Sequence, residues 1–217
     1  MYLCESISVS GFIQQLAVAY VSKGYLYYVR GFVKGTKDPR KVDLKIISEF
    51  EVDISKYTRY RKKAKGMANI QYLRFGRDFV ILATPGTCDR FYVQEKKSIR
   101  DIKKTPIRFQ NYSISYRGEK VHVRIADERY RELKSYLLDI ALHRKTEAVE
   151  AEFRKISFEP YAPVKAQLLS LWYNVNRVRK KAGYEPISKN CIRVSRKQVK
   201  ALLQDPSYME LLADKAA

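Results

Sequence analysis

The stretch from Ile46 to Lys63, IISEFEVDISKYTRYRKK, decides how the first half of the chain is read. Its opening isoleucines and phenylalanine are spaced like one face of a helix, and Ser55 is a residue that favours the cap of a second helix. Upstream, Asp38 is followed by a proline, a pair that favours a helix start. We therefore predict one helix from Pro39 to about Phe50 and another from Ile54 to about Lys65.

Segments on both sides of these helices are rich in aromatic and β-branched residues, which favour strands. Tyr25–Val33 precedes the helices, while Ile70–Phe75 and Phe79–Ala83 follow them, separated by a short turn. A further helix is predicted from Ser10 to Gly24, because serine favours the start of a helix and glycine its end. The expected order is helix, strand, helix, helix, strand, strand.

This order, together with the quoted stretch, resembles the winged helix-turn-helix superfamily of DNA-binding proteins over about Ser10 to Ala83. The resemblance implies that Ile54–Lys65 is the recognition helix, the element that enters the major groove in such proteins. It also implies that Arg74–Arg77 is the tip of the wing. Val52 would lie in the turn between the two helices, where Glu51 replaces the glycine that is common there.

The rest of the chain predicts a small sheet followed by helices. Phe91–Val93 reads as a short strand, and residues 112–125 alternate apolar and polar side chains around a turn, which is typical of a β-hairpin. Helices follow from Asp127 and from Val164 to Ala182. The predicted fold class is α+β, with an N-terminal winged-helix-like domain, a small antiparallel sheet and C-terminal helices. The predicted domains are residues 1–86, an α+β unit at 87–160, and a basic helical region at 161–217.

Charge is distributed unevenly along the sequence. The chain has 43 lysines and arginines against 23 acids, a formal net charge of +20, and it carries 27 aromatic residues. Ile54–Lys65 has six basic residues and no acid, and Arg177–Lys200 has nine against Glu185 alone, whereas Ala126–Lys155 is balanced. Concentrated positive charge favours a polyanionic partner. We expect a nucleic-acid-binding protein of replication, transposition or regulation, with duplex DNA as first partner and structured RNA as second.

The residues predicted to contact nucleic acid are basic side chains of the two charged segments and of the wing. Lys56, Arg59 and Lys63 are expected to share one face of the recognition helix, whereas Tyr57 and Tyr60 are expected to pack inward. The full predicted set is Lys56, Arg59, Arg61, Lys62, Lys63, Lys65, Arg74, Arg77, Arg177, Arg179, Lys180, Lys181, Arg193, Arg196 and Lys197.

Two aromatic-rich segments leave an alternative open. Exposed aromatic residues beside cations on a sheet would form a stacking platform for single strands. The tyrosines of Tyr25–Phe32 and Asn111–Arg117 fit that pattern, but burial of one sheet face explains their alternation too, and we expect burial.

Catalysis has weaker support in the sequence. Asp89 with Glu95 and Lys97 has the residue types of a magnesium-dependent nuclease, provided that the three side chains converge. The only two histidines, His122 and His143, lie in different predicted elements. We expect no catalytic residues beyond these weak candidates, and no metal or other cofactor. A basic scaffold subunit of a ribonucleoprotein complex, with a protein partner, is the other alternative.

The sequence also favours a cytoplasmic protein with no membrane partner. Its three cysteines are scattered without metal-binding spacing, which indicates a reducing compartment. No apolar run approaches the ~20 residues of a membrane helix, and the first residues lack the pattern of a signal peptide.

Overall fold

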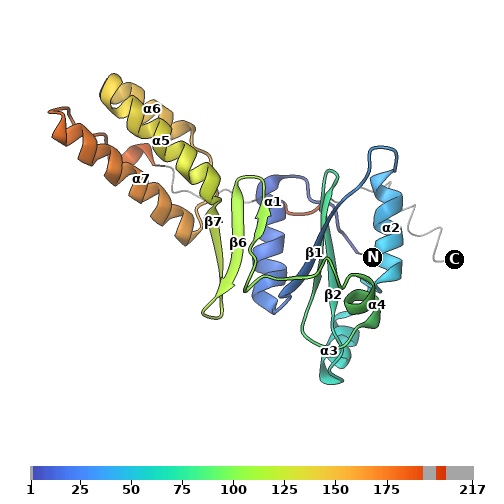
Figure 1. Cartoon of the computed structure of the whole chain (residues 1–217). Helices are drawn as coiled ribbons and strands as arrows, with labels where there is room; N and C mark the ends of the chain where they lie inside the picture. The colour runs from blue at the N-terminus through green and yellow to red at the C-terminus, as the bar shows by residue number, and fades with distance from the viewer. Residues whose placement is uncertain (1, 193–198, 204–217) are drawn as a thin grey trace. The chain divides into compact units, whose positions relative to one another are not determined.

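The structure, a computed structural model, describes residues 2–192 and 199–203 and combines helices with antiparallel sheets. The α+β class is therefore confirmed. Within the described residues the chain forms two compact units (Figure 1). The first unit holds residues 2–106, 116–121 and 199–203, and the second holds residues 107–115 and 122–192.

The first unit is built around a four-stranded sheet with the strand order β2-β3-β1-β4, in which all neighbours are antiparallel. Helices lie between β1 and β2 and between β3 and β4, so the unit has a split β-α-β arrangement. The four strands are β1 (Tyr27–Phe32), β2 (Ile70–Phe75), β3 (Asp78–Ala83) and β4 (Arg100–Asp101).

Helices cover both faces of this sheet. α2 (Pro39–Glu49) and α4 (Asp89–Gln94) lie on one face, where Ile46, Ile47 and Phe91 share a core cluster with strand residues. α1 (Val9–Gln14) lies on the opposite side in Figure 1, and its Phe12 ring stands 6.4 Å from that of Phe75 on β2.

Most predicted elements of this unit are confirmed, with local corrections. The first helix begins at Val9, capped by Ser8 rather than Ser10, and continues through a π-helix (Gln15–Tyr20) and a 3₁₀ turn (Val21–Lys23) to Gly24. The predicted strand Phe91–Val93 is wrong, because these residues lie in α4. The predicted domain boundary after residue 86 falls inside the first unit, since α4 and β4 complete its layers.

The second unit contains three helices that pack around one core. They are α5 (Asp127–His143), α6 (Thr146–Lys155) and α7 (Ala162–Lys181). They lie side by side in Figure 1, and α7 buries Leu168, Leu171 and Val175 in the same cluster as Leu137 of α5 and Phe153 of α6. The predicted domain boundary after residue 160 differs from the structure, because α7 shares one core with α5 and α6.

A second sheet, in the order β5-β6-β7, precedes these helices in the chain. Its strands are β5 (Ile107–Phe109), β6 (Tyr112–Arg117) and β7 (Lys120–Ile125), so the predicted hairpin is confirmed. The amide of Gln167 on α7 binds the backbone of Ile125 on β7, accepting from its N–H at 2.8 Å and donating to its carbonyl at 3.2 Å. Across residues 2–192 and 199–203, no helix is apolar and long enough to cross a membrane.

Candidate nucleic-acid interface

The predicted recognition helix is α3 (Lys56–Ala64), and its start follows from the sequence. The Ser55 hydroxyl accepts a hydrogen bond from the backbone N–H of Thr58 at 3.1 Å, and the helix ends before Gly66, whose φ is 71°. None of its residues is buried. Thr58, Arg59 and Lys62 are half-buried, and the other residues of α3 are exposed.

The exposed tyrosines of α3 correct one prediction. Tyr57 and Tyr60 are 66% and 71% exposed, so the prediction that they pack inward is wrong. The guanidinium of Arg61 lies 4.9 Å from the centre of the Tyr57 ring, one helical turn away. A cation over an aromatic face is a favourable pairing that keeps both groups at the surface.

Arg59 occupies the inward side of α3 instead. Its Nη2 donates to the carbonyl of Val52 at 2.6 Å, and its Nη1 donates to the carbonyl of Ile70 at 3.1 Å. The Asn69 side chain in turn donates to the Arg59 carbonyl at 3.0 Å. Arg59 therefore links the turn, the helix and β2, and the prediction that it contacts nucleic acid is not supported.

Lys62 also forms an ion pair within the first unit. Its Nζ lies 2.8 Å from a carboxylate oxygen of Glu51, and this contact lowers the pKa of the Glu51 carboxyl. Glu51 has a φ of 49°, in the left-handed region that favours glycine. Glu51 thus adopts a backbone conformation typical of glycine, and its carboxylate partly neutralises Lys62.

The predicted wing-tip Arg74 is buried, with 2% of its surface exposed. Its Nε donates to Asp43 at 2.8 Å and its Nη2 lies 2.9 Å from Glu5, while the Tyr72 hydroxyl donates to Asp43 at 2.6 Å. These carboxylates outweigh burial and raise the pKa of the Arg74 guanidinium. Burial and the negative charge of Asp43 raise the pKa of Tyr72. The prediction that Arg74 contacts nucleic acid is therefore wrong.

Arg77 holds the loop between β1 and α2. Its guanidinium donates to the carbonyls of Lys34 at 2.8 Å and Val33 at 3.2 Å, with longer bonds to those of Lys37 and Gly35. The backbone carbonyls of this loop use the donors that the wing prediction assigned to phosphates.

The prediction that Arg179 of α7 contacts nucleic acid is also not supported, because its donors are used within its own unit. Arg179 is 2% exposed, and its Nε donates to the Glu185 carbonyl at 2.6 Å. Its terminal nitrogens donate to the carbonyls of Ala141 and Arg144 and to the Thr146 hydroxyl, at 2.9 to 3.1 Å. This arginine therefore ties the ends of α5, α6 and α7 together.

The other described residues predicted on α7 remain at the surface. Lys180 and Lys181 are exposed, and Arg177 is exposed while donating to the Asn174 side chain at 3.1 Å. Tyr173, which the sequence reading did not single out, is 64% exposed one turn before Arg177. The predicted contacts Arg193, Arg196 and Lys197 lie outside the described residues.

The nuclease candidates do not form a metal site. Asp89 is the first residue of α4 and Glu95 follows its last residue, about 9 Å further along the helix axis. Lys97 lies beyond the helix, before β4. Within residues 2–192 and 199–203, no three His, Cys, Asp or Glu side chains are placed to hold a metal ion.

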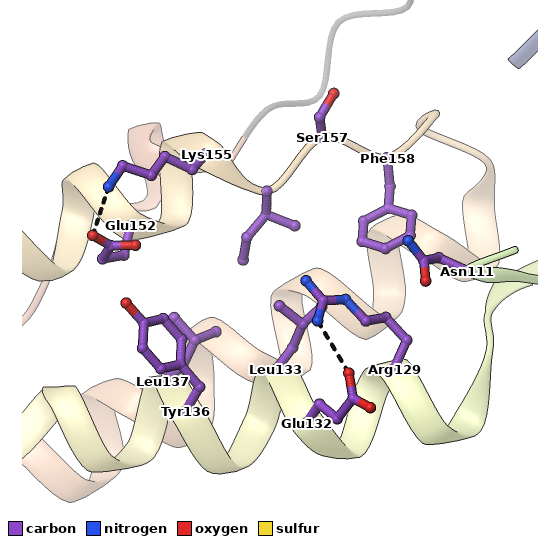
Figure 2. A pocket seen from close by; sticks show the side chains of 11 residues that line it. Asn111, Arg129, Glu132, Leu133, Tyr136, Leu137, Glu152, Lys155, Ser157 and Phe158 are labelled. Atoms are coloured by element: carbon purple, nitrogen blue, oxygen red, sulfur yellow. Dashed lines mark hydrogen bonds and ion pairs between the residues drawn. The ribbon is translucent and has the colours of Figure 1, made fainter. Parts of the chain in front are cut away.

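A pocket of about 420 Å³ in the second unit has a different charge character from α3. Figure 2 shows Lys155 paired with Glu152 at 2.7 Å along one wall and Arg129 paired with Glu132 at 3.0 Å along the other. Tyr136 points toward Glu152, and the hydrogen bond between them raises the pKa of the Tyr136 hydroxyl. Because each cation has an acidic partner, this pocket does not offer the unbalanced charge of α3.

Comparison with known proteins adds no relative. The sequence matches no protein-family model and no curated protein. The fold and surface together define an α+β protein in which the exposed residues of α3, apart from Ala64, are cations and tyrosines.

Proposed function

We propose that the protein binds nucleic acid, with duplex DNA as the first partner and structured RNA as the second, and that α3 is the main contact. The observation that carries this proposal is the solvent face of α3. It presents Lys56, Arg61, Lys63 and Lys65 beside two exposed tyrosines, with no acidic residue between positions 54 and 65. A surface of this composition suits a phosphate backbone.

Helical spacing arranges these side chains in two neighbouring rows. Lys56, Tyr60 and Lys63 follow each other at intervals of four and three residues, and Tyr57, Arg61 and Lys65 at intervals of four. Each row combines two cations with one aromatic ring. The cations displace counterions from phosphates, and the rings contribute contact area and a hydroxyl.

The exposed side of α7 supplies a second contact surface. Tyr173, Arg177 and Lys181 recur at intervals of four residues, with Lys180 beside them. A protein that binds polyanions with two such surfaces suits replication, transposition or regulation. None of the three cysteines, all of which lie within the described residues, forms a disulfide, and this supports a cytoplasmic location.

Titration of labelled polymers tests this proposal. Duplex DNA, hairpin RNA and single strands are each titrated at about 50 and 200 mM salt, with expected losses of affinity of several orders of magnitude between the two. Tyr60→Ala should weaken the preferred complex, whereas Arg131→Gln on α5, within the charge-balanced range Ala126–Lys155, should not. Wild-type protein that binds none of these polymers at the lower salt concentration would overturn the proposal.

A further inference from the structure

A groove of about 540 Å³ opens on the sheet face of the first unit, beside β1 and β4. It lies apart in sequence from α3 and from the balanced pocket of the second unit. Its lining residues are Tyr28, Arg30, Gly31, Phe32, Asp78, Lys97, Ser98 and Arg100.

Phe32 is the unusual member of this lining. Phe32 is the last residue of β1, and 61% of its surface is exposed although it is a large apolar residue. Tyr28, four residues earlier on the same strand face, is fully buried, and its hydroxyl lies 3.2 Å from the carbonyls of Thr105 and Pro106. The predicted burial of the first aromatic segment is thus confirmed for Tyr28, while Phe32 leaves one ring open to a ligand.

Three basic residues line the same groove as this ring. Arg30 on β1 lies opposite Val80 of β3, Arg100 on β4 lies opposite Tyr28 of β1, and both arginines are exposed. Lys97 belongs to the segment before β4. Tyr28 also lines the groove. Burial raises the pKa of its hydroxyl, while the positive charges of Arg100 and Arg30 lower it, so both guanidinium groups influence this hydroxyl. Asp78 is the acid of this lining, 3.9 Å from Arg30. The groove therefore keeps an excess of positive charge.

We propose that this groove binds one unpaired nucleotide of a single-stranded segment, with the base stacked on Phe32 and the phosphate near Arg30, Lys97 and Arg100. Phenylalanine has no hydrogen-bonding group, so it selects a flat π-face and not a particular base. A paired base inside a duplex has its faces covered by its neighbours, and only an unstacked base can reach the ring. The inference rests on the proposed nucleic-acid function but assigns a separate surface to it.

The volume of the groove and its combination of aromatic and basic residues also suit a nucleotide. Pockets that bind small ligands commonly measure about 300 to 1,000 Å³. An acidic peptide would use the same cations but would gain little from an exposed phenyl ring. The combination of ring and cations therefore favours a nucleotide over a carboxylate-bearing partner.

Anisotropy titrations with short labelled oligo(U), oligo(dT) and a duplex of equal length test the groove. Phe32→Ala should weaken single-strand binding about tenfold or more, Phe32→Trp should retain it, and Asp78→Asn should strengthen it. Duplex binding should stay unchanged in Phe32→Ala and fall in Lys63→Gln. Comparison of oligo(U) with oligo(dT) shows whether the strand is RNA or DNA.

The outcomes separate the two proposals. Wild-type protein that binds the duplex but neither oligonucleotide overturns the groove assignment and leaves the proposed function standing, whereas binding of no polymer overturns both. Equal single-strand affinity of wild type, Phe32→Ala and Phe32→Trp would overturn the stacking role. Displacement of the oligonucleotide by poly-glutamate at lower concentration than by unlabelled strand would assign the groove to an acidic partner instead.

Discussion

Arginine side chains perform two different tasks in this chain. Among the predicted contact residues, Arg59, Arg77 and Arg179 donate to backbone carbonyls, and Arg74 pairs with buried Asp43. A guanidinium carries five donors in a planar fork, so one side chain can satisfy several acceptors at the ends of different elements. A lysine ammonium has no such fork, and Lys56 and Lys63 of α3 remain exposed. Counting basic residues therefore overestimates the surface that is open to a polyanion.

The pairing of Asp43 with Arg74 gives a test of stability. Asp43→Ala removes the buried carboxylate that Arg74 and Tyr72 share and leaves only the partly exposed Glu5 beside the guanidinium, which we expect to lower the free energy of unfolding by about 3–5 kcal/mol. Urea denaturation measures this loss. Lys41→Ala, an exposed change on the same helix, should stay within about 0.5 kcal/mol of wild type. A loss below about 1 kcal/mol for Asp43→Ala would contradict the buried pair.

Arg59 and Lys63 should respond in opposite ways to truncation. Arg59→Ala removes the donors to two backbone carbonyls and should cost about 1–3 kcal/mol of stability. Lys63→Ala should leave the melting temperature unchanged and weaken nucleic-acid binding. Thermal melting and polymer titration of both variants check this. An equal melting temperature for wild type and Arg59→Ala would refute the structural role of this arginine.

Because of Tyr92, we expect the free energy of unfolding to fall at high pH. Burial raises the pKa of Tyr92 to about 12, and its hydroxyl donates to the Thr84 carbonyl at 3.0 Å. The pKa of Tyr92 is therefore higher in the folded state than its ordinary value near 10 in the unfolded state. The neutral phenol stabilises the fold fully below pH 10, and this contribution is lost as the pH rises through 12. Tyr92→Phe should show a smaller fall in the free energy of unfolding over that range. An unchanged pH dependence would contradict the raised pKa of the half-buried Tyr92.

At the scale of elements, the sequence predicted the helices better than their orientation. The position and caps of α3 followed from Ser55 and Gly66. Helical spacing shows which residues share a face, but it does not show which face turns inward. The aromatic rings of Tyr57 and Tyr60 favour burial, whereas the carbonyls of Val52 and Ile70 accept hydrogen bonds from Arg59, so the arginine takes the inward side.

Some signals for the corrected residues were present in the sequence. Asp43 lies three, four and seven residues before Ile46, Ile47 and Phe50, on the same face of α2 as the apolar residues. A carboxylate in that position needs a buried cation, so its partner could be sought among the arginines. The identity of Arg74 as this partner depends on the β2 register, which no local pattern specifies.

The two tyrosines of α3 distinguish a core role from a surface role. Tyr57→Ala and Tyr60→Ala should leave stability within about 0.5 kcal/mol of wild type, because both rings are exposed. In a core, truncation of a ring this large would cost about 3–5 kcal/mol. Denaturant unfolding of the two variants measures the difference. The same variants should weaken nucleic-acid binding, with Tyr136→Ala on α5 as an exposed control.

At the scale of the whole molecule, the class was predictable and the partition of the chain was not. Local patterns indicated both sheets and the long helices. They did not show that β4 joins β1 in the first sheet, or that α7 shares its core with α5 and α6. Both features depend on contacts between segments far apart in sequence, so the structure has two units where the sequence favoured three regions.

The central claim is that the cations of α3 engage phosphates, and the salt dependence of binding tests it most directly. The dissociation constant for the preferred polymer is measured across a salt series for wild type and for the triple variant Lys56→Gln, Lys63→Gln and Lys65→Gln. A second triple variant, Lys120→Gln, Arg131→Gln and Lys145→Gln, makes the same charge change outside α3. We predict that the α3 variant lowers the slope of log affinity against log salt by about 2 to 3, while the second variant leaves it close to wild type. Equal slopes for the two triple variants would contradict the claim, because binding would then follow total charge and not the surface of α3.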